Sequence, residues 1–188
     1  MASTYTPLGI EKMATGENAG TWGTKTNANL DLAEQLLGGF KTVSIAGGAG
    51  TTTLTVADGA LTGTAQARMI EFTGSISGNQ VVTIPLDIEN FYILKNTTSG
   101  AYTVQFKYAS GSGDTFTFAA TNKGTAILFA TANDGTNPDI IQIQTGGDVV
   151  DDTSPQLGGD LDVNGNKIVS TSNGNIELEP NGTGDVIL

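Results

Sequence analysis

The chain has 188 residues, a formal net charge of −11 and neither cysteine nor histidine, and charged residues make up only 14% of it. No cluster of Lys and Arg is present to attract nucleic-acid phosphates or an anionic lipid surface, so we expect no nucleic-acid partner. No stretch approaches the roughly 18 apolar residues of a membrane span, so we expect no membrane insertion.

Residues 1–40 read as an N-terminal arm with one helix, predicted over residues 27–37. Thr26 or Asn27 is placed to cap the helix, and Gly38 and Gly39 to end it. Its apolar residues recur at helical spacing and form one stripe, Leu30, Ala33, Leu36 and Leu37. A helix this short needs a docking surface. That surface is either the β domain of the same chain, or copies of the chain or another protein.

Residues 41–145 read as an all-β domain, because short alternating runs are separated by Gly, Asn and Asp turn signals. Their number and spacing predict a β-sandwich of the jelly-roll kind. The expected strands are 42–45, 51–56, 68–73, 80–84, 91–96, 102–108, 115–118, 124–130 and 139–144.

Residues 146–156 form a predicted linker that contains Pro155, and residues 157–188 form what we call the C-terminal strip. Asn-Gly pairs recur at 164–165, 173–174 and 181–182. Asn-Gly between short apolar runs favours type I′ turns, because both residues accept a positive φ. The runs between the turns are too small to bury a core alone. The strip is therefore expected to begin a repetitive β shaft built by several chains together.

Residue types that carry catalysis are scarce. The absence of His and Cys removes the usual general base, the thiol nucleophile and the common zinc ligands, so we expect no enzymatic activity and no cofactor. One segment resembles the opening of a calcium loop, with Asp160, Asp162 and Asn164 as possible ligands. The closing position of that loop holds Thr171, which cannot supply a bidentate carboxylate, and the simpler interpretation is an Asn-Gly turn with solvated Asp side chains.

Two segments resemble virion structural proteins of marine tailed bacteriophages, their tail fibres above all. The run 152–170, Asp-Thr-Ser-Pro-Gln-Leu-Gly-Gly-Asp-Leu-Asp-Val-Asn-Gly-Asn-Lys-Ile-Val-Ser, is similar to a stretch common in such proteins. It is followed by the matching continuation 173–188. The run 20–35, which contains Trp-Gly-Thr-Lys-Thr-Asn-Ala-Asn-Leu, resembles the start of such proteins.

The resemblance implies a homotrimeric tail fibre, located in the tail of the virion and made in the host cytoplasm. It implies that residues 1–40 anchor to other tail proteins of the adaptor or nozzle kind, with Trp22, Leu30, Leu36 and Leu37 as contacts. Because the chain stops within the repeat pattern, we expect the proximal part or adaptor of a fibre that supports host adsorption and joins distal fibre components. The alternatives are a capsid head-decoration protein and a carbohydrate- or calcium-binding module.

Overall fold

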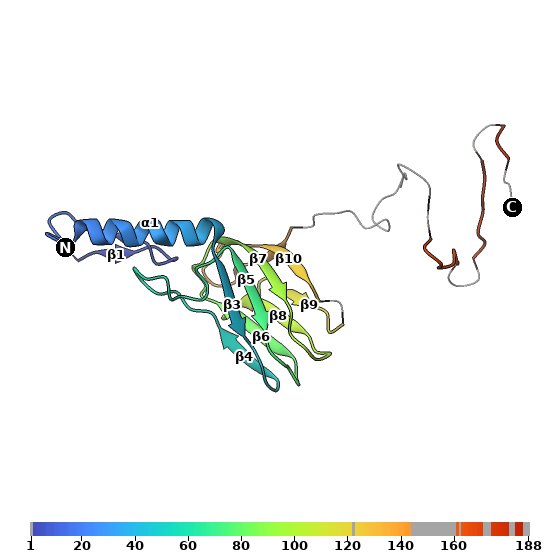
Figure 1. Ribbon diagram of the computed structural model, residues 1–188, viewed down its shortest axis with the longest axis horizontal. Helices are drawn as coiled ribbons and strands as arrows, with labels where there is room; N and C mark the ends of the chain where they lie inside the picture. The colour runs from blue at the N-terminus through green and yellow to red at the C-terminus, as the bar shows by residue number, and fades with distance from the viewer. Residues whose placement is uncertain are drawn as a thin grey trace. The chain divides into compact units, whose positions relative to one another are not determined.

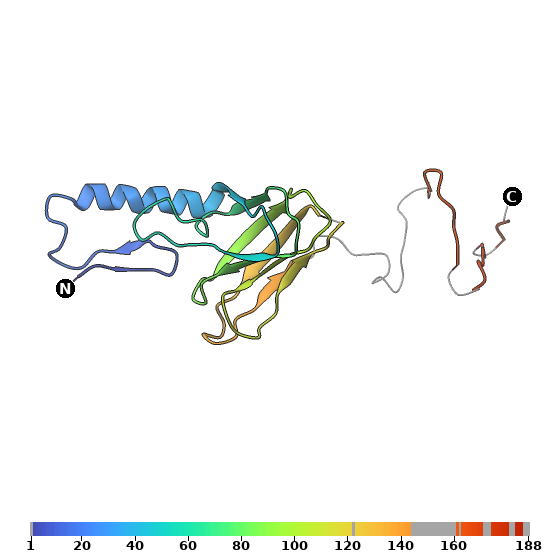
Figure 2. The ribbon, with the colours of Figure 1, turned by 90° about the horizontal axis from the view of Figure 1, so that it is seen from below.

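The N-terminal arm consists of a two-stranded ribbon and a helix that lie side by side (Figures 1 and 2). Strands β1 (Thr4–Tyr5) and β2 (Glu11–Lys12) pair antiparallel, and α1 covers Trp22–Gly38. The computed structural model describes residues 2–121, 123–143, 161, 163–170, 174–180 and 183–185. The chain divides into two units, Met1–Gly146 and Gly147–Leu188, and the arm belongs to the first.

Helix α1 is confirmed where the sequence predicted a helix, but it begins five residues earlier. The N-cap position is Thr21, whose side chain makes no capping hydrogen bond, so the prediction of Thr26 or Asn27 as the cap is wrong. Contacts between the start of α1 and β2 stabilise the extra turn. Lys25 and Asn29 both bond Glu11, and these bonds outweigh the weak helix propensity of Gly23 and the threonines. The helix ends at Gly38, one residue beyond the predicted end, and the Gly39 N–H donates to the Gln35 carbonyl.

After the arm, the described residues of the first unit form nine strands in two mixed sheets. A five-stranded sheet has the order β11-β10-β7-β5-β3, and a four-stranded sheet has the order β4-β6-β8-β9. Each predicted strand is present, and the bounds shift by a few residues at most. The strands are β3 (Phe40–Ser44), β4 (Gly50–Thr53), β5 (Met69–Thr73), β6 (Gln80–Ile84), β7 (Asn90–Asn96), β8 (Val104–Tyr108), β9 (Phe116–Phe118), β10 (Thr125–Ala130) and β11 (Ile140–Gln142).

The strand order is that of a coil, and the predicted jelly-roll arrangement is not confirmed. From β3 to β8 the chain alternates between the sheets, and each strand pairs in parallel with the strand two positions along the chain. A parallel pair needs a crossover connection, and here the crossover is a strand of the opposite sheet. The chain passes from one sheet to the other at corners of the coil. Parallel bridges between Gly47 and Ile76 and between Ser75 and Ser99 continue the strand pairing there. Strands β9, β10 and β11 then pair antiparallel and close the last turn of the coil.

The corners of the coil require close backbone approach. Gly100 has a φ of +96°, and a Cβ atom there would lie 2.2 Å from the carbonyl oxygen of Ile76 in the preceding turn. A side chain at this position would both strain the backbone and push the two turns apart. This glycine therefore fixes how closely successive turns of the coil stack.

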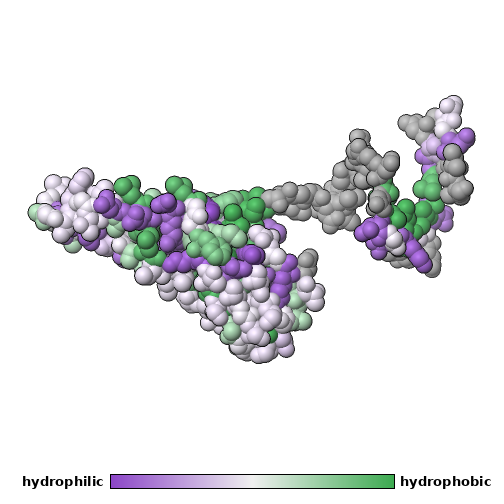
Figure 3. Space-filling view, viewed as in Figure 1, coloured by the Kyte–Doolittle hydropathy of each residue, from purple (hydrophilic) through white to green (hydrophobic). Residues whose placement is uncertain are grey.

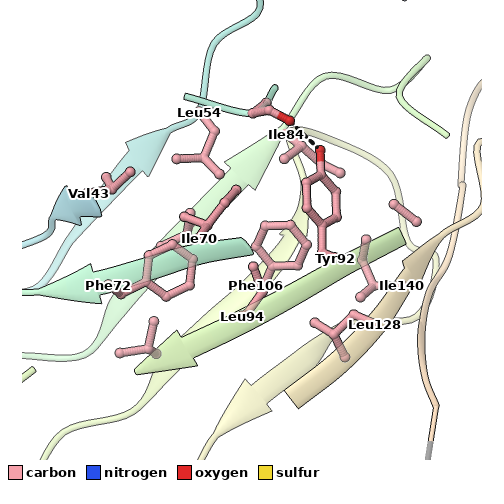
Figure 4. Packing of buried hydrophobic residues seen from close by; sticks show 14 of the residues in the cluster. Val43, Leu54, Ile70, Phe72, Ile84, Tyr92, Leu94, Phe106, Leu128 and Ile140 are labelled. Carbon is pink, nitrogen blue, oxygen red and sulfur yellow. Dashed lines mark hydrogen bonds between the residues drawn. The ribbon is translucent and has the colours of Figure 1, made fainter. Parts of the chain in front are cut away.

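The core lies between the two sheets and is filled by alternate residues of their strands. In β7 and β8 every second residue is buried, as expected for strands with one face on a core. Figure 4 shows Ile70, Tyr92 and Phe106 meeting between the sheets, and the rings of Tyr92 and Phe106 cross edge to face at 5.7 Å. The Tyr92 hydroxyl donates to the Ala65 carbonyl at 2.9 Å. Burial raises the pKa of Tyr92 well above its usual range, so this hydroxyl stays a donor.

The described residues of the second unit include a turn of the predicted kind. The Asn166 N–H donates to the Val163 carbonyl at 2.9 Å, and Asn164 and Gly165 have φ values of 45° and 77°. Two positive φ values at the centre of a four-residue turn are what a type I′ turn requires, so this part of the prediction is confirmed. The predicted linker 146–156 lies outside the described residues. So do Asn173, Asn181 and Gly182 of the other two Asn-Gly pairs.

Candidate partner-binding surfaces

An ion pair and an amide clamp hold the two pieces of the arm together. The Lys25 ammonium lies 3.0 Å from Oε2 of Glu11, whose side chain is almost completely buried. The side-chain amide of Asn29 accepts from the Glu11 N–H and donates to its carbonyl, both at 2.9 Å. The hydrogen bond from Lys25 lowers the pKa of the Glu11 carboxyl, and Glu11 raises that of Lys25. The ribbon therefore presents α1 as a fixed rod.

A buried glutamine joins the arm to the coil. The Gln66 side chain donates from Nε2 to the carbonyls of Leu8 and Ala57 at 2.8 and 3.1 Å, and its Oε1 accepts from the Ala57 N–H at 2.9 Å. Its own carbonyl accepts from the Gln35 amide of α1. Gly9, with a φ of +80°, passes so close that a Cβ atom would lie 2.5 Å from Nε2 of Gln66. Gln66 thus connects three segments. Its side chain joins the ribbon to the 57–66 loop, and its backbone carbonyl joins both to the helix.

The exposed apolar face of α1 consists of Trp22, Leu30 and Leu37, which are 62%, 63% and 74% exposed. Figure 3 shows hydrophobic residues along this helix. Of the four residues predicted as contacts, Leu36 differs, because it is 9% exposed and lies on the inner face with Leu32, which is fully buried. The predicted stripe of Leu30, Ala33, Leu36 and Leu37 is therefore split, because Leu30 and Leu37 are exposed, Ala33 is half-buried and Leu36 is part of the arm's own packing.

The described part of the C-terminal strip leaves its apolar side chains uncovered. Ile168, Val169, Ile176 and Leu178 are all exposed. The two runs between the Asn-Gly turns are residues 167–170 and 175–179, and neither pairs with a strand among the described residues of this single chain. Apolar side chains on an unpaired backbone are typical of a surface that is completed by another chain.

The predicted calcium ligands are only partly visible. Asp160 and Asp162 lie outside the described residues, and Asn164 occupies the type I′ turn. Among the residues that the structure describes, no group of three or more acidic side chains converges in the way a metal ion requires.

An open groove runs between the arm and one end of the coil. It consists of two neighbouring hollows of about 630 and 600 Å³ that share Thr6, Pro7 and Asp87. The 6–10 turn of the ribbon, the β6–β7 loop and the β10–β11 loop supply most of its lining. Its apolar lining includes Leu8, Ile10, Leu86 and Val56, and its carboxylates are Asp58, Asp87 and Glu89. We call it the acidic groove, and sequence patterns gave no sign of it.

Tyr108 fixes two of the loops that line the acidic groove. Its hydroxyl donates to the Ile88 carbonyl at 2.7 Å and accepts from the Ala132 N–H at 2.8 Å. Ala132 has a φ of 43°, which is uncommon for a residue with a Cβ atom, so this hydrogen bond helps to hold a strained loop in place. Burial raises the pKa of the Tyr108 hydroxyl, which keeps it protonated and able to donate.

Comparison of the chain with protein-family models, with curated protein sequences and with solved structures found no match. Within the part of the chain that the structure describes, no helix has the length and apolar character needed to cross a membrane.

Proposed function

We propose that this chain is a structural virion protein, the proximal part or adaptor of a bacteriophage tail fibre, and that it works as a homotrimer. The observation that carries the proposal is the exposure of Ile168, Val169, Ile176 and Leu178 in the C-terminal strip. A strip of this size cannot bury these side chains by itself, whereas strips from three copies together can form the start of a repetitive β shaft.

The N-terminal arm provides a second observation that supports the proposed function. The apolar face of α1 is held rigid by the ribbon and presents Trp22, Leu30 and Leu37 on one side of a rod. Aromatic and large aliphatic side chains on a pre-formed surface are the usual anchors of protein interfaces. In the proposed fibre this face packs against copies of itself or against a tail protein, and the strip leads toward the distal fibre components.

Light scattering on the full chain tests the proposal. We expect a mass of three chains. Where the α1 face packs against copies of itself, the double variant Leu30→Glu/Leu37→Glu should lower that mass, because six charges would enter the trimer interface. Asn27→Glu adds a charge at an exposed polar position of the same helix and serves as the control. A monomer at micromolar concentrations for the unmodified chain would contradict the proposal.

Antibody labelling of residues 174–180 on intact particles separates the tail from the capsid. Label at the tail supports the fibre. Label distributed over the head would instead identify a head-decoration protein.

A further inference from the structure

The acidic groove has the chemistry of a site for a basic segment with apolar neighbours. Asp58, Asp87 and Glu89 are exposed, and among the described residues none of them makes a hydrogen bond or an ion pair. The two hollows contain no Lys or Arg in their lining. Each has a volume in the range of ordinary ligand sites, so a few side chains of an extended peptide fit in it.

Most basic residues of the chain already have partners. Of its eight Lys and Arg residues, five make ion pairs or hydrogen bonds, namely Lys25, Lys41, Arg68, Lys95 and Lys123. Among the described residues, no such contact is made by Lys12, Lys107 or Lys167. Lys107 lies within β8 between two buried aromatic residues, and Lys12 follows the buried Glu11 in β2. Both are therefore committed to sheets and cannot enter a groove as part of an extended segment.

Lys167 is the exception. It is exposed and is followed directly by Ile168 and Val169, which are exposed as well. In the sequence it is the single charged residue between Asp162 and Glu177, so this part of an otherwise acidic strip is locally positive. A base with adjacent apolar side chains on unpaired backbone matches an apolar groove with three unpaired carboxylates.

We propose that the acidic groove of one copy of this chain binds the Lys167-Ile168-Val169 segment of a second copy. The Lys167 ammonium lies beside Asp87, the carboxylate that both hollows share, and the two apolar side chains contact the aliphatic lining. Complementary charge at the rim steers and orients such a contact, while the apolar lining supplies most of its affinity. The proposal goes beyond the fibre function, because it names a contact from strip to groove that a trimer joined through its helices and strips does not need.

Because the chain contains no cysteine, disulfide trapping gives a clean test. One copy carries Gly135→Cys in the groove lining, and the other carries Asn166→Cys next to Lys167. The matched control replaces Gly135→Cys by Gly48→Cys. Both glycines are exposed, neither has a positive φ, and a Cβ atom meets nothing within 4 Å at either position. We expect covalent dimers between copies from the Gly135 pair at a yield at least about fivefold above the Gly48 pair, in line with a site that local charge and apolar contact favour.

Charge reversal checks the assignment. Lys167→Glu in the copy that carries Asn166→Cys should remove most of the excess dimer yield of the Gly135 pair. Adding Asp87→Lys/Glu89→Lys to the copy that carries Gly135→Cys should restore this yield. Equal yields for Gly135 and Gly48, or an unchanged yield with Lys167→Glu, would overturn the proposal. A chain carrying both cysteines that closes only on itself, at any concentration, would also overturn it. Light scattering that still gives three chain masses would then leave the fibre function standing.

Discussion

Replacing Gln66 by Leu should release the arm from the coil. The substitution keeps the side chain close in size but removes its three hydrogen bonds and leaves the Leu8 and Ala57 carbonyls and the Ala57 N–H without those partners. Each buried polar group that loses its partner costs about 1–3 kcal/mol. Because Leu8 and Ala57 are only partly buried, water can reach some of these groups, and we expect a total loss of about 3 kcal/mol.

Urea unfolding measures this loss, with Gln105→Leu as the control. The Gln105 amide makes one exposed hydrogen bond, to Thr115, so its replacement should change stability by less than about 0.5 kcal/mol. At a typical slope, a loss of 3 kcal/mol lowers the midpoint by about 1–3 M urea. Trypsin should also cut faster after Lys12 and Lys25 in the Gln66 variant. If both variants had the same midpoint and the arm were cut no faster, Gln66 would not be the joint that its contacts indicate.

Two further predictions follow from buried side chains. The folded-state pKa of Glu11 lies below its ordinary value of 4.5, so its ion pair with Lys25 stabilises the protein above that pH, and the contribution is lost as the pH falls through the lowered pKa. Thermal melts between pH 7 and pH 3 should therefore fall more for the natural chain than for Glu11→Gln, and parallel curves would refute this. Tyr108→Phe removes two hydrogen bonds and should cost about 2 kcal/mol in unfolding experiments, whereas Tyr102→Phe, at a half-exposed position, should cost less than about 0.5 kcal/mol.

The strands of this protein could be predicted from sequence, because their alternation is strong and their ends carry turn residues. Strand β6 has the predicted bounds, Gln80–Ile84. Their pairing could not be predicted, since parallel and antiparallel strands with one buried face show the same alternation. The coil depends on close contacts at its corners, such as that of Gly100 with the Ile76 backbone, and such residues lie far apart in the sequence.

The helix shows a similar limit. An apolar pattern finds Leu30, Leu36 and Leu37, but the inner row of α1 is Lys25, Asn29, Leu32 and Leu36. Half of that row is polar, and it faces the ribbon because Lys25 and Asn29 bond Glu11. No hydrophobic periodicity can find such a face. The acidic groove was equally hidden, because the segments that line it come from the arm and from two distant loops of the coil.

The sheet order gives the first unit two distinct ends. The chain enters the coil from α1 through β3, at one edge of the five-stranded sheet, and leaves it through β11, at the opposite edge. Five strands separate these edges by about 19 Å. At the entry end, β3 and β4 pair on one side only, and their single charged side chain, Lys41, bonds the Leu61 carbonyl. Open strand edges with so little charge favour pairing with another chain. Helix α1 leads into β3 at this end, and the described residues of the first unit end just after β11, at the opposite edge of the sheet.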